Sequence, residues 1–471
     1  MHTPEIQSDI LGYLKTHENK AMLRFITCGS VDDGKSTLIG RLLHDTKMIF
    51  EDQLEAITKE SKKVGTTGER VDLALLVDGL QSEREQGITI DVAYRYFTTD
   101  KRKFIIADTP GHEQYTRNMA TGASTADAAI ILIDARHGIQ TQTRRHSYIT
   151  RLLGITHTIV AINKMDLVGY AQEVFERIKA EYVHFAGEIG IKDVAFIPLS
   201  ALEGDNVASK SSAMPWYEGK SLLETLETIP EAQETEAPFR FPVQWVNRPH
   251  LNFRGFSGSV ASGTVRVGDS VRVLPSNFTS KIASIVTYDE EQERATAPMA
   301  VTVTLEDEID IGRGDVLVHA HDVPELCTAF EATLVWMSDA PLRLGMPYAL
   351  KMNAKTVDGF VEEVLFRKDV NTQGEHPAQT LGLNDIGRAK VVLSSSVLCD
   401  TYEANRNTGR FIIIERYTNK TVGVGMIVGK AKRVQQAHHV SEYEKELNAF
   451  VRKHFPHWEA KDVSVREDFT I

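Results

Sequence analysis

Residues 22–229 alternate short apolar runs with amphipathic stretches. The apolar runs predict buried strands at Leu23–Cys28, Phe104–Asp108, Ala128–Asp134, Thr158–Asn163 and Ala195–Leu199. The stretches between them predict helices, among them Ser36–His44, Thr143–Leu153 and Ala171–Phe185. Because alternation of strand and helix is typical of βαβ units, we expect an α/β domain in which a mostly parallel sheet carries helices on both faces.

The pattern changes at residues 230–238, which are acidic, bounded by prolines and poor in large apolar side chains, as in a linker. From Phe239 onward, short runs of alternating β-branched residues predict strands. Within Val260–Val273 these runs are interrupted at Gly263 and Gly268, as they are in hairpins. We expect such strands to close into β-barrels, because closure removes exposed strand edges.

These patterns divide the chain into six parts. They are an N-terminal extension (1–21), the α/β domain (22–229), the linker (230–238), a first β-barrel (239–325), a second β-barrel (326–430) and a C-terminal tail (431–471). Within the tail, Val440–His454 is compatible with a helix.

Composition narrows the class of protein. Of the 471 residues, 42% are apolar and 25% charged, as in ordinary globular proteins. The longest apolar runs fall far short of the ~20 residues that a membrane span requires, and the N-terminus lacks the pattern of a secretory signal. The three cysteines, Cys28, Cys327 and Cys399, are too dispersed for a local metal motif. We therefore expect a cytoplasmic protein in a reduced compartment.

The net charge is −12, from 53 Lys and Arg against 65 Asp and Glu. Nucleic-acid affinity depends on basic surface, so this charge disfavours a general nucleic-acid binder. An acidic chain can still carry a local basic patch, and charge alone leaves a role in RNA binding open.

The strongest motif is Gly29-Ser-Val-Asp-Asp-Gly34-Lys35-Ser36, a phosphate-loop pattern between a predicted strand and a predicted helix. Its glycines allow backbone N–H groups to surround phosphate oxygens, and the helix N-terminus adds partial positive charge. We expect Lys35 to reach the β- and γ-phosphates and the Ser36 hydroxyl to bind Mg²⁺.

Two further motifs suit the same phosphates. In Asp108-Thr-Pro-Gly111-His112, we expect Asp108 to hold Mg²⁺ through water, the Gly111 N–H to meet the γ-phosphate and His112 to orient an attacking water. Between the two lies Gln86-Gly-Ile-Thr89-Ile-Asp91. The Thr89 hydroxyl can complete the Mg²⁺ shell while the γ-phosphate is present, and loss of that phosphate would release the loop as a switch.

The base is expected to bind after two later strands. The Asp166 carboxylate of Asn163-Lys-Met-Asp166 can accept from N1–H and the 2-amino group of guanine, a donor pair that adenine lacks. Ser200-Ala-Leu202 would bring a backbone N–H to guanine O6. Five motifs in this order predict a GTP-binding domain that transfers the γ-phosphoryl group to water.

The predicted site therefore spans five loops. Its nucleotide-binding residues are Gly29, Ser30, Val31, Asp32, Asp33, Gly34, Lys35, Ser36, Thr37, Asp108, Thr109, Pro110, Gly111, His112, Asn163, Lys164, Asp166, Ser200, Ala201 and Leu202. The catalytic candidates among the site residues are Lys35, Thr89, Gly111 and His112, and the metal ligands are Ser36, Thr89 and Asp108.

A GTPase domain followed by two β-barrels resembles the translational elongation-factor superfamily. Met214-Pro-Trp-Tyr217 and Ser221-Leu-Leu-Glu224 look like its eukaryotic-type branch. The phosphate loop departs from that pattern, because elongation factors usually carry His-Val-Asp-His where this chain has Ser30-Val-Asp-Asp33.

Longer motifs resemble the GTPase subunit of the bacterial two-subunit sulfate adenylyltransferase, over about residues 15–430. These motifs are Ser82–Tyr96, Asp108–Asp127, Leu334–Ser338, Leu383–Arg388 and Asp400–Phe411. The most distinctive stretch is Asn405-Arg-Asn-Thr-Gly-Arg-Phe411.

The resemblance implies a large subunit whose GTP hydrolysis drives the conversion of ATP and sulfate to adenosine 5′-phosphosulfate and pyrophosphate. A separate small catalytic subunit would transfer the adenylyl group, in a heterodimer or a higher hetero-oligomer that involves neither nucleic acid nor membrane. GTP and Mg²⁺ are the expected cofactors. We expect a switch segment near Val64–Asp91 to couple the two activities, with the loop after Gly111 as the second candidate.

Three other features carry weaker signals. A second Gly-Lys-Ser, at Gly219–Ser221, lacks the first glycine of the pattern and is not expected to bind nucleotide. His454-Phe-Pro-His457 has the His-x-x-His spacing of sulfurylase-type adenylyl transferases, but we interpret it as surface tail. A fused adenylylsulfate kinase would need another phosphate loop and about 150 more residues, and is not expected. The alternatives are a translation factor that delivers tRNA and a non-catalytic nucleotide-gated scaffold.

Overall fold

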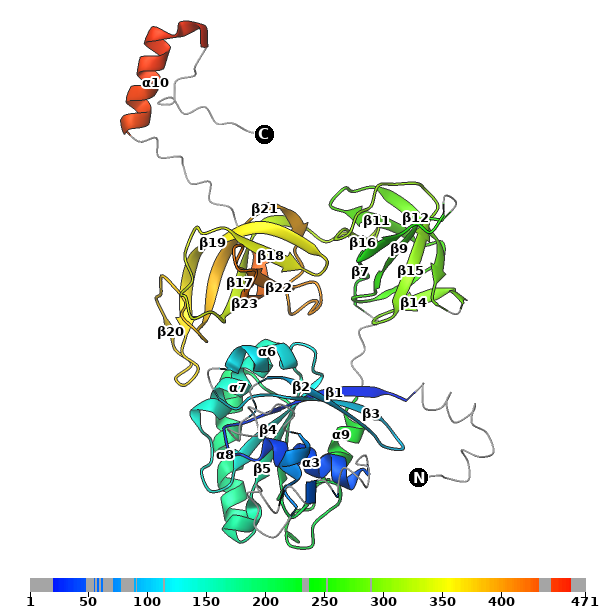
Figure 1. The fold of residues 1–471 in the computed structure, drawn as a ribbon, viewed down its shortest axis with the longest axis vertical. Coiled ribbons are helices and arrows are strands. Elements are labelled where there is room, and N and C mark those ends of the chain that lie inside the picture. Colours follow the sequence, from blue (N-terminus) through cyan, green and yellow to red (C-terminus); the bar gives the residue numbers. More distant parts are fainter. Residues whose placement is uncertain are drawn as a thin grey trace. The chain divides into compact units, whose positions relative to one another are not determined.

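The computed structural model describes residues 20–47, 55, 57, 58, 61, 71–77, 89, 91–112, 115–230, 237–250, 253–288, 290–431 and 442–458 (Figure 1). The chain forms two compact units, Met1–Lys430 and Ala431–Ile471. The first unit contains an α/β domain and two antiparallel β domains, so the predicted fold class is confirmed.

The α/β domain is built on a six-stranded sheet with the strand order β2-β3-β1-β4-β5-β6. Its strands are β1 (Met22–Cys28), β2 (Ala93–Thr98), β3 (Lys103–Asp108), β4 (Ala128–Asp134), β5 (His157–Asn163) and β6 (Val194–Pro198). All neighbours pair in parallel except β2, which runs antiparallel to β3 at the edge. The five predicted strands agree with the structure to within one residue at each end. The edge strand β2 was not predicted, because its alternating polar and aromatic residues lack a continuous apolar run.

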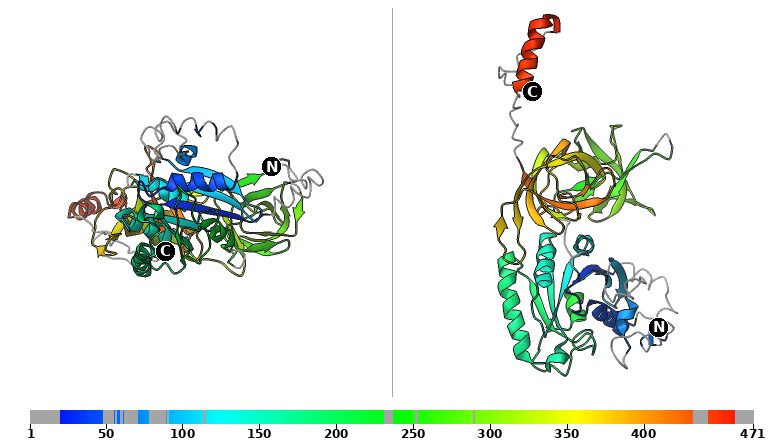
Figure 2. Two further views of the ribbon diagram at one scale, coloured as in Figure 1. Left: turned by 90° about the horizontal axis from the view of Figure 1, so that it is seen from below. Right: turned by 60° about the vertical axis from the view of Figure 1, so that its left-hand side comes forward.

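Helices cover both faces of this sheet, as Figure 2 shows. They are α3 (Lys35–Asp45), α6 (Thr116–Ala123), α7 (Thr141–Leu152), α8 (Gln172–Ile189) and α9 (Leu222–Thr228), with short 3₁₀ turns η1 (Leu73–Leu76) and η3 (Met165–Val168). On one face, Leu38 of α3 and Leu226 of α9 pack into one apolar core. On the other face, Met119 of α6, Ile149 of α7 and Ile178 of α8 pack into a second core. The sheet is therefore buried on both sides, which explains its nearly continuous apolar strands.

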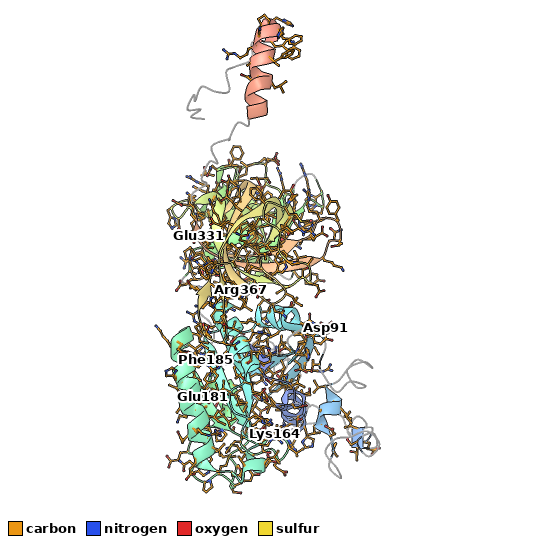
Figure 3. All side chains as sticks on the ribbon, turned by 90° about the vertical axis from the view of Figure 1, so that its left-hand side faces the viewer. Asp91, Lys164, Glu181, Phe185, Glu331 and Arg367 are labelled. Atoms are coloured by element: carbon orange, nitrogen blue, oxygen red, sulfur yellow. The ribbon has the colours of Figure 1, made fainter. Side chains whose placement is uncertain are left out.

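Helices α7 and α8 are also joined by polar contacts. Arg144 Nη2 lies 3.3 Å from Glu181 Oε1, and the Arg144 guanidinium lies 4.9 Å from the centre of the Phe185 ring (Figure 3). Deeper between the helices, Ser147 Oγ and Tyr182 OH share a buried hydrogen bond of 2.8 Å. These contacts fix the position of α7, which packs behind the phosphate loop.

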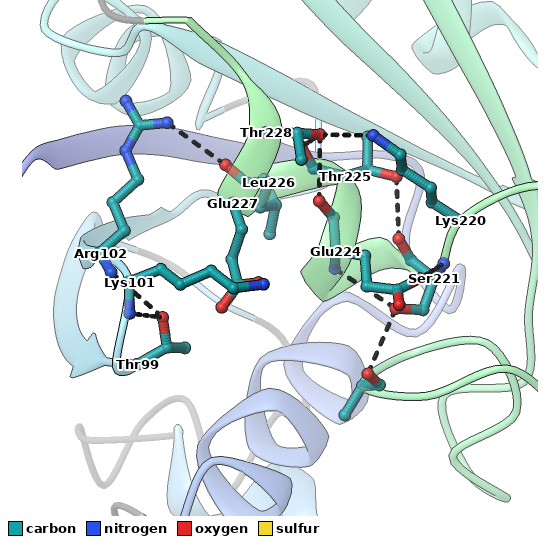
Figure 4. Close-up of polar contacts among 11 residues, drawn as sticks. Thr99, Lys101, Arg102, Lys220, Ser221, Glu224, Thr225, Leu226, Glu227 and Thr228 are labelled. Carbon is teal, nitrogen blue, oxygen red and sulfur yellow. Dashed lines mark hydrogen bonds and ion pairs between the residues drawn. The ribbon is translucent and has the colours of Figure 1, made fainter.

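Helix α9 begins at the second Gly-Lys-Ser of the chain (Figure 4). Ser221 Oγ accepts a hydrogen bond from the Glu224 N–H, and Glu224 Oε2 accepts one from the Ser221 N–H at 3.0 Å. This reciprocal pair is a capping box, which satisfies backbone donors at the start of a helix. Ser221 thus has a structural role at the start of α9.

The next β domain, which we call barrel 2, contains short strands around one apolar core. Its strands are β7 (Arg240–Pro242), β8 (Trp245–Asn247), β9 (Gly255–Ser259), β10 (Thr264–Arg266), β11 (Ser270–Leu274), β12 (Thr279–Val286), β13 (Glu291–Gln292), β14 (Arg294–Thr296), β15 (Ala300–Leu305) and β16 (Val316–His319). The main sheet has the order β7-β16-β11-β12-β15-β9-β8, and β10 pairs separately with β14.

The following domain, barrel 3, closes completely. Its strands are β17 (Leu326–Trp336), β18 (Tyr348–Met352), β19 (Lys355–Lys368), β20 (Glu375–His376), β21 (Ile386–Leu398), β22 (Arg410–Ile414) and β23 (Thr421–Lys430). The order β18-β22-β23-β17-β21-β19 returns to its start through pairing of β18 with β19, so six strands form a closed ring. Because the ring is closed, none of these six strands has an unpaired edge, which is the expected benefit of a barrel.

Residues 400–411, which we call the bridging segment, connect barrel 3 to the α/β domain. The Tyr402 hydroxyl donates to Leu153 O at 2.7 Å, at the end of α7. Arg410 Nη1 donates to Ser124 O at 2.8 Å, at the end of α6. The segment therefore contacts the C-terminal ends of two helices that pack on the sheet of the α/β domain.

The bridging segment also contacts barrel 2. Arg240 Nε donates to Asp400 Oδ2 at 3.0 Å, and Asn405 Nδ2 donates to Ser262 Oγ at 2.7 Å. Arg240 and Asn405 are both buried, so these hydrogen bonds are shielded from solvent. The distinctive sequence of this segment thus provides the polar contacts of a junction between three domains.

The second unit contains α10 (Glu442–His454) and the 3₁₀ turn η5 (Pro456–Trp458). The predicted helix is confirmed over Glu442–His454, and the first two residues of its predicted range lie outside the described residues. Its His454 and His457 are exposed and make ring contacts with nearby aromatic side chains. No described helix of the chain has the length and apolar character needed to cross a membrane.

Candidate functional site

The phosphate-loop motif lies between β1 and α3, as predicted. Gly34 has φ 92° and caps α3, a conformation that L side chains rarely adopt. A Cβ atom on Gly34 would overlap Asn163 Nδ2, and one on Gly29 would lie 3.0 Å from Leu132 O. The two glycines are therefore required because Leu132 of β4 and the Asn163 side chain approach the backbone closely.

Two charged side chains are buried inside this loop. Asp33 Oδ2 accepts a hydrogen bond from the Ser30 N–H at 2.5 Å, and Lys35 Nζ donates to Gly29 O and Ser30 O at 3.2 and 2.7 Å. Burial raises the pKa of the Asp33 carboxyl and lowers the pKa of the Lys35 ammonium, and each charge opposes the shift of the other. The loop thus holds an ammonium group in a site where its charge is poorly solvated and an anionic ligand is favoured.

The second phosphate motif reaches the same place through strand pairing. Residues Thr27 of β1 and Asp108 of β3 are partners in the parallel register, and Thr27 Oγ1 donates to Asp108 Oδ1 at 3.3 Å. The Thr109 hydroxyl donates to Thr27 O at 2.7 Å. Since the carboxyl ends of parallel strands meet at one sheet edge, Asp108 lies beside the phosphate loop.

The base motifs are bound directly to the phosphate loop. Asn163 Nδ2 donates to Asp33 O at 2.7 Å, and Asn163 Oδ1 accepts from the Ala201 N–H at 2.9 Å. Lys164 Nζ donates to Asp32 O. Asn163 therefore connects its own loop to the phosphate loop at Asp33 and to the loop that contains Ala201.

Buried polar atoms without a hydrogen-bond partner among the described residues occur at both ends of the site. Asp166 Oδ1 is one at the base end, and Ser30 Oγ is one at the phosphate end. A buried acceptor without a partner is costly, and an incoming ligand that donates to it recovers that energy. The unpartnered oxygen of Asp166 fits the donor edge of a guanine.

Comparison with known proteins agrees with this geometry. A protein of Shewanella woodyi named sulfate adenylyltransferase subunit 1 is 60% identical over 460 residues, covering 98% of this chain and 98% of that protein. The chain belongs to the sulfate adenylyltransferase subunit 1 family. Relatives of the same name from Cellvibrio japonicus and Aliarcobacter butzleri are 61% and 58% identical, covering 97% and 98% of this chain and 98% of each relative. The predicted resemblance is confirmed.

Models of broader families match two parts of the chain. The elongation factor Tu GTP binding domain matches residues 20–232, and the GTP-eEF1A C-terminal domain-like family matches residues 329–428. The first match includes all five motifs and supports GTP binding. The chain therefore has a GTPase domain of the elongation-factor type, and its relatives are named as a subunit of sulfate adenylyltransferase.

The switch motif is described only in part. Gln86–Ile88 and Ile90 lie outside the described residues, as does most of Val64–Asp91. Thr89 is half-buried, and Asp91 is exposed with its Oδ1 accepting from the Val92 N–H at 2.7 Å. The placement of Thr89 at a metal site stays a prediction.

The remaining predicted residues have these positions. Val31 and Asp32 are exposed, Thr37 is half-buried, and Pro110 and Ala201 are buried. Arg41 of α3 donates to Leu202 O, and Ser200 Oγ accepts from the Glu203 N–H at 3.2 Å. His112 is half-buried with its ring 6.1 Å from that of Tyr115.

One residue beside the base loop was missed by sequence reasoning. Asp134 ends β4, is buried, and lies 3.1 Å from Lys164 Nζ and 2.7 Å from Arg136 Nη2. Burial alone would raise its pKa, but hydrogen bonds from Arg136 and Lys164 prevail and lower the pKa to about 2. Asp134 thus holds the lysine of the base motif, and its place at the end of a predicted strand was the available signal.

A second residue that sequence reasoning missed is hydrogen-bonded to the phosphate loop. His146 of α7 is fully buried, and its Nδ1 accepts a hydrogen bond from the Gly29 N–H at 3.2 Å. Burial lowers its pKa to about 3, so the ring is neutral and Nδ1 stays an acceptor at neutral pH. Nothing in the spacing of His146 indicated this contact, which depends on how α7 packs.

Substitution of Gly111 by alanine tests how closely the two phosphate loops approach. A Cβ there would lie 2.5 Å from Lys35 Nζ and 2.9 Å from the backbone of Ser30 and Val31. We expect Gly111→Ala to weaken binding of a GTP analogue at least about tenfold, because the loops must separate. Gly187→Ala is the matched control, since nothing lies within 4 Å of a Cβ at Gly187. Equal affinities in calorimetry for both variants would contradict this arrangement.

Proposed function

We propose that this chain is the GTP-hydrolysing subunit of a sulfate adenylyltransferase. GTP hydrolysis would drive the formation of adenosine 5′-phosphosulfate and pyrophosphate from ATP and sulfate. The observation that carries the choice of GTP is the buried, unpartnered Asp166 Oδ1 beside the Asn163 network. Membership of the subunit 1 family carries the link to sulfate.

Hydrolysis would depend on positioning and charge rather than on covalent chemistry. Lys35 and the backbone N–H groups of its loop would bind the β- and γ-phosphates, while the Gly111 N–H would meet a γ-phosphate oxygen. These donors are fixed before the reaction, so they stabilise charge that develops in the transition state without reorganisation. His112, on the loop after Gly111, would orient the attacking water.

The residues present suit a magnesium ion. When bound, Mg²⁺ would supply positive charge that neutralises the phosphates. Ser36, Thr89 and Asp108 would hold it, with Asp108 acting through water. Mg²⁺ is commonly held by one or two carboxylates together with phosphates and waters.

The name of the relatives, subunit 1, implies a partner subunit. We propose that a small catalytic subunit carries out the adenylyl transfer in a hetero-oligomer. Two features of this chain support that division. Its second Gly-Lys-Ser forms a helix cap, and the His454 and His457 pair is exposed on the separate α10 unit.

The direct test is to co-express this chain with candidate small subunits and measure pyrophosphate release from ATP and sulfate. We expect release to require GTP and to be accompanied by GTP hydrolysis, with GDP unable to replace it. Release that proceeds equally without GTP would contradict the coupling. Stimulation of the GTPase by ribosomes would instead favour the translation-factor alternative.

Thr89→Ala tests the proposed switch. A hydroxyl that binds Mg²⁺ only while the γ-phosphate is present contributes to the GTP state and not to the GDP state. We therefore expect GDP affinity to stay within about twofold and the amount of adenosine 5′-phosphosulfate formed per GTP hydrolysed to fall at least about tenfold. Thr89→Ser keeps the hydroxyl and should retain coupling. Normal coupled turnover in Thr89→Ala would refute the switch role.

A further inference from the structure

Two of the three cysteines meet at one end of barrel 3. Cys327 lies on β17, opposite Val397 of β21, and Cys399 follows the end of β21 by one residue. The Cys399 N–H continues the ladder by donating to Glu325 O at 3.1 Å. Cys399 is therefore the diagonal neighbour of Cys327 on the same face of the strand pair. Cys327 belongs to the apolar core of the barrel, and Cys399 packs against that core.

The surroundings make the two thiols unequal. Cys327 is buried, whereas Cys399 is half-buried and closer to solvent. Interaction with the Cys327 thiol lowers the pKa of Cys399, which burial opposes and the charge of Lys430 assists. The same interaction, together with burial, raises the pKa of Cys327. Cys399 is the more exposed of the two and a thiolate is the reactive form of cysteine, so Cys399 is the attacking group and Cys327 the second thiol.

The third cysteine has the opposite character. Cys28 ends β1 just before the phosphate loop and is completely buried. Burial raises the pKa of its thiol to about 12. Cys28 is therefore expected to resist oxidants under conditions that modify the pair.

We propose that Cys327 and Cys399 form a reversible disulfide that regulates this subunit. The oxidant is a disulfide of low molecular weight. The Cys399 thiolate attacks one of its sulfur atoms, forms a mixed disulfide and releases one small thiol. The Cys327 sulfur, losing its proton, then attacks Cys399 and releases the second small thiol. The protein loses two electrons and two protons, and the small disulfide gains both.

Closing this bond requires movement at Cys399. Diagonal neighbours in a sheet lie about 7–8 Å apart between Cα atoms, whereas a disulfide spans about 4.4–6.8 Å. A register irregularity between Cys327 and Ala329 allows the strand pair to adjust there. Cys399 lies at the end of the ladder, where its hydrogen bond to Glu325 O is the last one, because β21 ends at Leu398. The shift therefore falls on Cys399 and the bridging segment that follows.

A shift of the bridging segment changes contacts with both barrel 2 and the α/β domain. Asp400, the next residue, binds the buried Arg240 of barrel 2 and accepts from the Thr408 hydroxyl at 2.6 Å. Through Arg410, the segment binds Ser124 at the end of α6. Helix α6 begins just after the loop that carries Gly111 and His112. The disulfide thus acts on the element that follows the catalytic loop.

Oxidation of the full chain by oxidised glutathione tests bond formation without reference to GTP. We expect mass spectrometry to show a loss of two hydrogens and, after trypsin digestion, a link between peptides 314–343 and 391–406. The glutathione adduct should appear first on Cys399. Failure to detect the linked peptide, or a link that involves Cys28, would overturn the proposal.

The regulatory consequence rests on the proposed GTPase activity and is measured separately. We expect GTP turnover of the oxidised chain to fall at least about threefold and to recover with dithiothreitol. Cys399→Ser should match the reduced protein and stay insensitive to the oxidant. A linked peptide with unchanged GTP turnover would overturn the switch. Absence of GTP turnover in the reduced protein would instead contradict the GTPase assignment, while leaving the disulfide result intact.

Discussion

Asp166→Asn is expected to reverse the base preference of the site, from GTP towards xanthosine triphosphate. Asp166 Oδ1 is buried without a partner among the described residues. A base that donates to it therefore gains most of the free energy of that hydrogen bond. A carboxylate accepts from both N1–H and the 2-amino group of guanine. An asparagine presents an N–H donor instead, which faces the guanine donors unfavourably and suits the 2-oxo group of xanthine.

Two hydrogen bonds to a charged acceptor contribute about 1.5 kcal/mol or more each, so GTP affinity should fall about 100-fold or more. Calorimetry or fluorescence competition with GTP and xanthosine triphosphate measures both affinities in the same variant. Asp193→Asn is the control, because Asp193 is an exposed carboxylate that binds His157 at the far end of β5. Unchanged preference for GTP in Asp166→Asn would show that another residue reads the base.

His112→Ala is expected to lower GTP turnover about 100-fold, the range for a residue that positions or activates a reacting group. The residue is half-buried on the loop after Gly111, and its ring lies near that of Tyr115. If it acts on water rather than on the nucleotide, binding should change little. We therefore expect the dissociation constant for a GTP analogue to change less than about threefold.

Single-turnover hydrolysis and equilibrium binding, measured on the same preparation, separate the two effects. His184→Ala is the control, because the His184 side chain is 80% exposed on α8, on the helix face near Glu188. Equal losses of turnover and affinity in His112→Ala would make the residue a binding contact. Rescue of turnover at higher pH would suggest that hydroxide can substitute for the oriented water.

Much of the fold follows from local patterns. The central strands were predictable because a parallel sheet covered on both faces has nearly continuous apolar strands, such as Ala128–Asp134, all of whose residues are buried. The edge strand β2 escaped prediction for the opposite reason. It is covered less fully, its alternation is mixed, and only pairing with β3 defines it.

The residues of the candidate site also fall into those that the sequence predicts and those that it does not. Glycines, a lysine and a carboxylate at set spacings indicate phosphate and guanine chemistry, because few residue types can perform those tasks. Residues that only support the site have no such signature. No local sequence pattern marks Asp134 or His146 as part of the site. Their roles depend on which strand and which helix lie against the base loop and the phosphate loop.

The sequence by itself determined the order of the five motifs, the α/β and β-barrel classes, and the family to which the chain belongs. These depend on local spacing and periodicity, which the chain carries wherever it folds. Only the tertiary structure decided that Asn163 joins three loops and that an oxygen of Asp166 is left buried without a partner. It also decided that Cys327 and Cys399 lie on the same face of one strand pair. Such contacts join residues far apart in the chain, so they exist only once sheet register and packing bring them together.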